Sequence, residues 1–234
     1  MKTKYFSILF IFCAMFGRAE AKAHKSPNEL ALEHCKGIVI VGNKNTEVLF
    51  SQDPHGRLSI EGCSVKDLKV TSSDSMLIVS AIGIDSVIPL QLCISMPFYE
   101  YLHCSFVKMV SNKEVIFGND ISITTIDADV NMNIEANHLQ MILLGGKSIF
   151  MSGMCKSADI TCNAYNHGEK CSFDASKLTI QNMHLYCGVK SKVFITVTDS
   201  LWLKGGIETQ VKVHGMPTIM ENKLFHSEVT LQNR

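Results

Sequence analysis

Val193-Phe-Ile-Thr-Val-Thr-Asp-Ser-Leu-Trp-Leu-Lys-Gly-Gly206 and the following Gln210-Val-Lys-Val-His-Gly-Met-Pro217 form the stretch that decides the fold. Apolar and polar residues alternate through it, which predicts three short strands, at Val193–Thr198, Leu201–Lys204 and Gln210–His214. Turn-forming residues separate these strands and follow the last one, at Asp199-Ser200, Gly205-Gly206 and Gly215-Met216-Pro217. We therefore expect strands of a few residues joined by tight turns.

The same alternation recurs along the chain at intervals of about 8–12 residues, which is typical of an all-β protein. It begins at the β-branched run Gly37-Ile-Val-Ile-Val-Gly42, and Pro89 is expected at a strand end. A β-sandwich or a barrel fits the spacing, whereas a right-handed parallel β-helix, a solenoid of short strands, fits the strand length better. Similar stretches also recur about 20 residues apart, which suits one turn of a solenoid. Spacing alone leaves both architectures open.

Composition sets the size and the overall charge. The chain has 234 residues, of which 46% are hydrophobic and 19% are charged, enough for one sizeable core. Lysine plus arginine and aspartate plus glutamate both total 22. A balanced charge gives no global field that would attract nucleic acid, so we expect no nucleic-acid partner.

The N-terminus has the pattern of a secretory signal peptide. Lys2 and Lys4 precede an apolar run, and Ala19-Glu20-Ala21 supplies the small residues that a signal peptidase recognises. We expect cleavage after Ala21, so residues 1–21 are the signal peptide and the mature protein carries a formal charge of −2. The apolar run is too short to span a bilayer, and no membrane-spanning segment is expected after cleavage.

The mature chain is expected to have three parts. Residues 22–35 form a flexible lead-in or a cap, which ends in a helical turn near residues 28–34. Residues 36–220 form the β domain, and residues 221–234 form a C-terminal cap or tail. An exported chain can form disulfides, but the eight mature cysteines allow 105 pairings, and buried free thiols are an equal alternative.

Two regions of the sequence resemble the head-GIN domain family, described as putative auto-transporter adhesins. The early region is Cys35-Lys-Gly-Ile-Val-Ile-Val-Gly-Asn-Lys-Asn-Thr-Glu-Val-Leu-Phe-Ser-Gln52, followed by Gly56–Gly62 and Met76–Val79; the late region is the stretch quoted first. The resemblance spans about residues 36–220. It implies an exported β-helical domain, located in the periplasm, at the outer surface or secreted, and an adhesin-like or structural role in a bacterial envelope. No catalytic residues carry over from it.

Candidate catalytic and metal sites have simpler explanations. Asp127 and Asp129 could project from one face of an extended segment, as in β-helical polysaccharide lyases or hydrolases, but a solvated turn is the favoured reading. Cys155, Cys162, His167 and Cys171 lack the spacing of a zinc site. Gly145-Gly146-Lys147-Ser148 leads into a strand and is expected to be a turn, not a phosphate-binding loop. We assign no catalytic, cofactor-binding or metal-binding residues and expect no cofactor.

Trp202 and Phe194 alternate out of phase with their apolar neighbours, which places both on an outer face. There they either contact a partner or are covered by the tail at 221–234. We expect a non-catalytic exported protein with an adhesin-like binding or scaffolding role, whose partner is a surface glycan or protein of unknown identity. The alternative is a carbohydrate-active enzyme that uses Asp127 and Asp129.

Overall fold

The computed structural model describes residues 28–32, 35–72, 75–84, 87–111, 114–146, 148–164 and 170–233. The predicted signal peptide at 1–21 and the first part of the lead-in lie outside the described residues. The elements are β1 (Glu29–Ala31), β2 (Gly37–Val41), β3 (Thr46–Gln52), β4 (Arg57–Glu61), the 3₁₀ turn η1 (Val65–Asp67), β5 (Lys69–Ser72), β6 (Met76–Ser80), β7 (Leu90–Met96), β8 (Tyr101–Ser105), β9 (Lys108–Ser111), β10 (Ile116–Ile126), β11 (Asp129–Leu144), β12 (Ile149–Asn163), β13 (Ser172–Cys187), β14 (Lys192–Ile207), β15 (Gln210–His214), β16 (Thr218–Phe225) and β17 (Glu228–Gln232).

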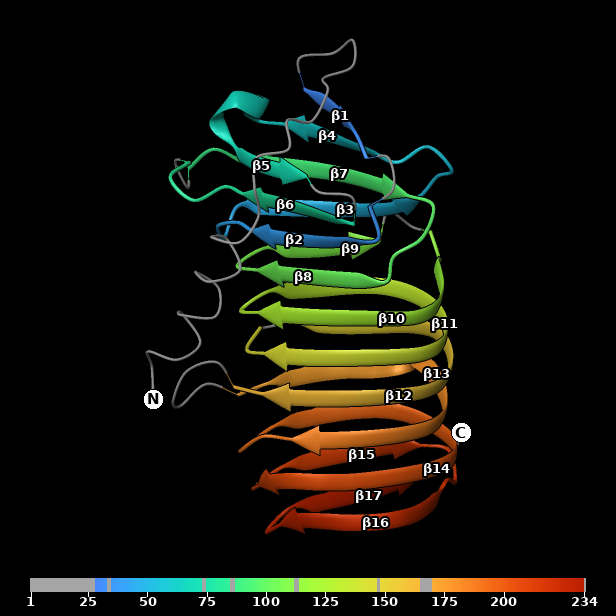
Figure 1. Cartoon of the computed structure of the whole chain (residues 1–234). Helices are drawn as coiled ribbons and strands as arrows, with labels where there is room; N and C mark the ends of the chain where they lie inside the picture. The colour runs from blue at the N-terminus through green and yellow to red at the C-terminus, as the bar shows by residue number, and fades with distance from the viewer. Residues whose placement is uncertain are drawn as a thin grey trace.

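The fold is all-β, and its strands form one curled sheet of 17 strands (Figure 1). The predicted strand at Gly37–Gly42 is present as β2, and β7 begins directly after Pro89, as expected. The lead-in differs from the prediction. Residues 29–31 form β1, a short strand antiparallel to β4, in place of a helical turn.

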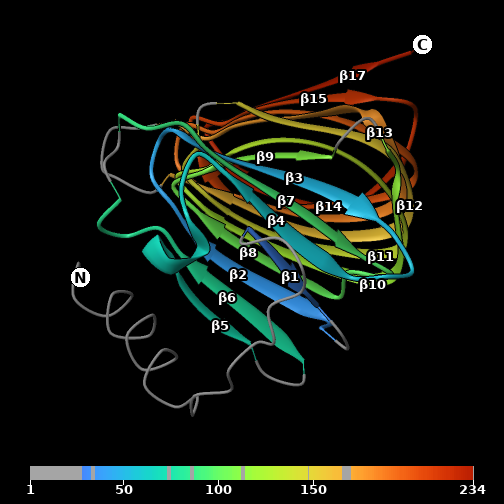
Figure 2. The same cartoon turned by 90° about the horizontal axis from the view of Figure 1, so that it is seen from above.

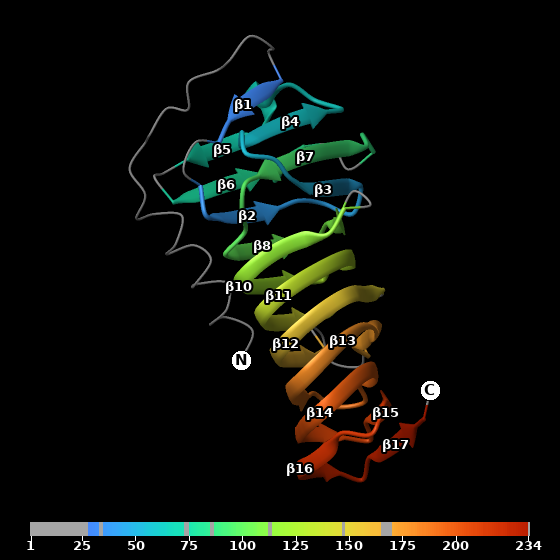
Figure 3. The same ribbon diagram turned by 90° about the vertical axis from the view of Figure 1, so that its right-hand side faces the viewer.

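The sheet curls because its long strands bend and contribute to two walls. In the first wall, β8 and the second halves of β10 to β14 pair in parallel and end at β16. In the second wall, β9 and the first halves of β11 to β14 pair in parallel and continue to β15 and β17. Figures 1 and 3 show the resulting stack, with the N-terminal strands at one end and β16 and β17 at the other.

The expectation of a right-handed parallel β-helix is not confirmed, because the sheet is mixed. β4 is antiparallel to β1 and β7, and β5 is antiparallel to β6. The connection between β5 and β6 is only a few residues long, and a tight connection of that length joins neighbouring strands only when they run antiparallel. The alternative of a sandwich of two separate sheets also does not match, since the strands belong to one sheet. Figure 2 shows the antiparallel strands covering one end of the curl.

The core lies between the two walls as columns of stacked apolar side chains. One column places fully buried residues from five successive strands side by side, namely Ile121, Leu139, Ala158, Met183 and Leu201. Burying a side chain of leucine size contributes about 1.5–3 kcal/mol, so the repeated columns supply the main driving force for the curl. The buried face alternates with an outward face along every strand.

The opening stretch contains two strands in place of the three predicted: β15 has the predicted bounds, but the strands predicted at Val193–Thr198 and Leu201–Lys204 are parts of one long, bent strand. β14 runs without interruption from Lys192 to Ile207, through Asp199-Ser200 and Gly205-Gly206, which are a bend and a bulge and not turns. In β12 the bend falls at Gly153, whose φ of 114° is accessible to glycine. A Cβ at this position would lie 2.0 Å from the carbonyl oxygen of Ile134, so only glycine fits.

Candidate functional site

The outward face of the first wall carries an unbroken row of polar and aromatic side chains. Gln140, Asp159, His184, Trp202 and Glu221 come from β11, β12, β13, β14 and β16 and lie in register, each beside the next. We call this row the outer ladder. Parallel strands are separated by about 4.8 Å, so neighbouring side chains in the ladder are close enough to act on one ligand.

Asp159 stands between two histidines. Its carboxylate oxygens lie 3.5 Å from Nε2 of His138 and 3.7 Å from Nδ1 of His184. The other ring nitrogen of His138 lies 2.9 Å from the hydroxyl of Ser157. Exposed ion pairs of this kind contribute at most about 1 kcal/mol to folding, so their main effect is to orient the three side chains. The group presents hydrogen-bonding atoms to the outside.

Aromatic rings adjoin this polar group. The rings of His184 and Trp202 have centroids 4.3 Å apart and are tilted by 40°. Tyr186, two residues beyond His184 on the same face, is 49% exposed. A Cβ at Gly205 would lie 2.9 Å from the Tyr186 ring, so the glycine leaves room for that ring to lie flat on the wall. Tyrosine and tryptophan with one polar end are enriched at contact surfaces.

Two open hollows lie at the N-terminal end of the walls, on either side of Phe98. The larger has a volume of about 800 Å³ and is lined by residues that include Cys35, His55 and Phe98. The smaller has a volume of about 620 Å³ and is lined by Phe98, His138 and Gln140 among others. The smaller hollow therefore opens beside the outer ladder.

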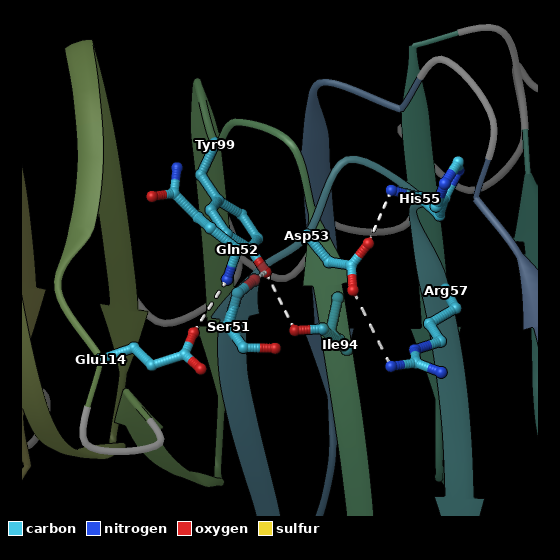
Figure 4. A network of polar contacts seen from close by, with 8 residues as sticks. All are labelled: Ser51, Gln52, Asp53, His55, Arg57, Ile94, Tyr99 and Glu114. Carbon is cyan, nitrogen blue, oxygen red and sulfur yellow. Dashed lines mark hydrogen bonds and ion pairs between the residues drawn. The ribbon is translucent and has the colours of Figure 1, made fainter.

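A polar network connects the hollows to the core (Figure 4). The buried Tyr99 hydroxyl donates to the carbonyl oxygen of Ser51 at 2.6 Å and to that of Ile94 at 2.9 Å. At the rim of the larger hollow, the Asp53 carboxylate accepts from the backbone N–H of His55 at 2.7 Å and lies 3.9 Å from Arg57. The rim of the larger hollow is charged, whereas Tyr99, which lines the smaller hollow, is a neutral phenol whose pKa burial raises.

Asp127 lies in the turn between β10 and β11, whereas Asp129 is the first residue of β11, so the turn is shorter than the one favoured from the sequence. Asp127 has a φ of 46°, and its backbone N–H donates to Leu144 at 2.8 Å. The Asp129 carboxylate accepts from the backbone N–H of Ser148 at 3.0 Å. Both residues thus tie this turn to the next one along the stack, where Gly145 and Gly146 form the predicted turn.

The three described cysteines of the cluster noted in the sequence, Cys155, Cys162 and Cys171, are buried free thiols. Burial raises the pKa of Cys155 to about 12 and also raises that of Cys162. The fourth member, His167, lies outside the described residues. Within the described ranges, no group of three histidine, cysteine or acidic side chains is arranged to hold a metal ion.

Trp202 and Phe194 both face outward, but they occupy different walls. Trp202 lies in the half of β14 that pairs with β16, where Glu221 from the predicted tail is its neighbour in the sheet. Phe194 lies in the half that pairs with β15, and the ammonium groups of Lys192 and Lys212 lie 5.2 Å and 5.6 Å from its ring centroid. The tail therefore forms the last turn of the stack and lies beside Trp202, not over it.

The outer ladder could not be found by scanning the sequence for short motifs. Its residues come from different strands, and the step from one to the next is 19 residues from Gln140 to Asp159 but 25 from Asp159 to His184. The unequal step follows from the longer connection between β12 and β13. Of the residues in the outer ladder, only Trp202 was placed on an outward face from the alternation of apolar and polar residues in the sequence.

Comparisons with known proteins place the chain in one family of putative adhesins. The model of a family described as "Putative auto-transporter adhesin, head GIN domain" matches residues 38–217. No curated protein sequence matches the chain significantly. Within the described ranges, no helix has the length and apolar character needed to cross a bilayer.

Solved structures share the fold at low sequence identity. A putative adhesin from Bacteroides fragilis NCTC 9343 has 14% identity and a TM-score of 0.71, with 91% of this chain and all of that chain covered. A putative adhesin from Parabacteroides merdae ATCC 43184 has 13% identity and a TM-score of 0.57, covering 93% and 100%. A putative lipid binding protein from Parabacteroides distasonis ATCC 8503 has 11% identity and a TM-score of 0.52, covering 92% and 100%.

Proposed function

Because the chain belongs to the head GIN domain family of putative auto-transporter adhesins, we propose that it is a non-catalytic binding protein of the bacterial envelope. It is exported through the signal peptide at residues 1–21 and acts in the periplasm or at the surface. Residues 36–220 form the binding domain, whose parallel strands wind as a right-handed coil. Residues 221–234 complete the last turn.

The outer ladder is the observation that carries this proposal. It combines the rings of His184 and Trp202, which Tyr186 adjoins on the same face, with the carboxylate of Asp159 on a rigid sheet. Flat rings supply apolar contact area at little cost in side-chain entropy, and the carboxylate and imidazoles supply directed hydrogen bonds. A surface glycan or a surface peptide presents both apolar surface for the rings and polar groups for the hydrogen bonds. The ladder is the binding face.

The alternative of a carbohydrate-active enzyme that uses Asp127 and Asp129 has weaker support. The carboxylate of Asp129 accepts a hydrogen bond from the next turn, which suits a structural role. Glycoside hydrolysis needs two carboxyl groups that face each other across the scissile bond. Asp127 lies in a tight turn and Asp129 at the start of β11, which does not suit carboxyl groups on opposite sides of a substrate.

A lipid-binding role, suggested by the name of one structural neighbour, also has weaker support. The space between the walls is filled by side chains that are fully buried, such as Leu139, Met183 and Leu201. The hollows beside Phe98 are open to the outside. Sites that enclose a small molecule are usually concave and largely apolar, unlike the outer ladder.

The single tryptophan makes the proposal directly testable. The fluorescence of Trp202 is recorded while a panel of bacterial and host glycans and surface peptides is added. A saturable change in emission is the expected result, because the ring lies in the proposed binding face. Product analysis of the same mixtures shows whether any glycan is cleaved, and cleavage would replace the binding proposal with the enzyme alternative.

Variants then locate the site by calorimetry, which does not depend on the tryptophan. Trp202→Ala and Asp159→Asn are expected to weaken binding, by about 30-fold for the tryptophan if it is a centre of the contact. Phe150→Ala is the matched control, because Phe150 is 50% exposed but lies on the other wall. Loss of binding in the control together with unchanged binding in both ladder variants would contradict the assignment.

A further inference from the structure

The C-terminal end of the stack has an open edge. β16 pairs in parallel with β14 along one edge, and no other described strand has a pairing register with it. Figure 3 shows β16 as the last strand of its wall, whereas the opposite end of the stack carries the antiparallel strands β1, β4 and β5. An open edge presents unpaired backbone N–H and C=O groups, which a further strand can pair with.

Exposed apolar side chains gather at the same end. Met220 and Phe225 of β16 are 56% and 65% exposed. Six of the sixteen large hydrophobic residues that are exposed in the described chain fall after residue 206: Ile207, Met216, Ile219, Met220, Phe225 and Leu231. A concentration of this kind marks a surface that another molecule covers.

The charges on β16 favour a second copy of this chain as that molecule. Glu221 forms ion pairs with Lys223 and, at 3.0 Å, with Lys204 of β14. A lone lysine on an edge strand opposes pairing, but Glu221 and Lys223 lie two residues apart on one face and have opposite signs. When two such strands run antiparallel about Asn222, Glu221 of each copy lies opposite Lys223 of the other.

The same register also matches the apolar residues. It places Met220 opposite Leu224 of the second copy and Ile219 opposite Phe225 of the second copy, so four apolar pairs flank the two charge pairs. Cross-strand pairs of both kinds stabilise antiparallel sheets. β17, the other strand with an open edge at this end of the described stack, is shorter and carries Glu228 as its only charge, so it offers no such match.

We propose that two copies of this chain associate through the open edges of β16, running antiparallel about a twofold axis at Asn222. The contact is isologous and closes on itself, so it makes a dimer and not a fibre. The axis stands perpendicular to the joined sheet, because adjacent antiparallel strands keep the same face outward. The outer ladders of the two copies consequently face the same side.

Charge exchange at β16 tests the pairing in the full chain. The molar mass of the mature protein is measured by sedimentation equilibrium at concentrations up to about 1 mM, the weak end of measurable protein affinity. We expect a reversible dimer. Glu221→Lys and Lys223→Glu each place like charges opposite one another twice per dimer and should weaken association by roughly tenfold to a hundredfold. The double variant E221K/K223E should recover most of the affinity.

A cysteine at the axis supplies an independent readout. In Asn222→Cys the two introduced cysteines lie on directly opposed residues, whose Cα atoms are about 4.5–5.5 Å apart in an antiparallel pair, within the range that a disulfide spans. Mild oxidation should cross-link this variant into a dimer but leave Lys212→Cys, exposed on the interior strand β15, uncross-linked. Circular dichroism verifies that each variant is folded.

The outcomes are decisive in either direction. A monomer throughout the concentration range, or a dimer that the double charge exchange fails to restore, would overturn the proposal. Equal cross-linking of the Asn222→Cys and Lys212→Cys variants would also overturn it, because random collision would then explain the disulfide.

Discussion

Tyr99 joins the N-terminal strands to the first turn of the parallel stack, and replacing it with phenylalanine removes one oxygen atom from this junction. The ring is 1% exposed and packs edge-to-face on Phe50, with centroids 5.7 Å apart. Its single hydroxyl proton is shared between the carbonyl oxygens of Ser51 and Ile94 (Figure 4). Tyr99→Phe keeps the ring contact and leaves two carbonyl groups without this donor.

The expected loss in the free energy of unfolding follows from the loss of this hydrogen-bond donor. Loss of a buried hydrogen bond that leaves its acceptor unsatisfied costs about 1–2 kcal/mol. For a chain of this size each kcal/mol shifts the melting temperature by about 2–4 °C, so a fall of about 2–8 °C is expected. Urea titration should show a lower midpoint with an unchanged slope, since the same surface is exposed on unfolding.

Tyr186→Phe is the matched control, because Tyr186 carries the same hydroxyl on an exposed ring. Its effect should stay within about 0.5 kcal/mol. Equal stability of Tyr99→Phe and the wild type would refute the reasoning, since it would mean that the hydroxyl contributes nothing to the junction. A large loss in both variants would point to a general effect of removing the hydroxyl and would refute it as well.

Two further predictions concern protons and thiols. Burial lowers the pKa of His103, so as the pH falls the unfolded chain takes up a proton at this residue before the folded chain does. The stability of the fold should therefore decrease as the pH drops from about 7 toward about 5. Melting experiments across this pH range should show a smaller decrease for His103→Gln. Among the eight described cysteines, only Cys63 and Cys93 are partly accessible, so a thiol reagent should label these two in the native protein and the remaining six after unfolding. Labelling should accelerate at alkaline pH, because burial raises the pKa of both thiols; rapid native labelling of six or more would contradict the buried core.

The sequence predicted the class of fold and much of its detail because alternation reports burial directly. The buried and exposed residues of Gln210–His214 alternate as expected, and Pro89 marks the start of β7 because proline lacks the N–H that a strand interior needs. The family resemblance over residues 36–220 is confirmed by the match over 38–217. Asp127 lies in the turn that was favoured for it, whereas Asp129 begins β11.

The alternation of apolar and polar residues could not predict that two expected short strands form one continuous strand. Asp199-Ser200 has the composition of a turn, yet β14 passes through it, because the stacking of β14 between β13 and its next neighbours holds the backbone extended. The antiparallel N-terminal strands were missed for a related reason: pairing direction depends on which strands become neighbours, and local sequence does not encode that choice. The outer ladder depends on the same long-range register.

The parallel turns of the stack touch only the turn before and the turn after, and this has a consequence for how the protein varies in length. One whole turn can be gained or lost without altering the contacts of any other turn, because each interface repeats the last. Each added turn lengthens the stack by about 4.8 Å and adds one more position to the outer ladder. The length of the stack and the length of the outer ladder, the proposed binding face, therefore change together, in whole steps, during the divergence of such chains.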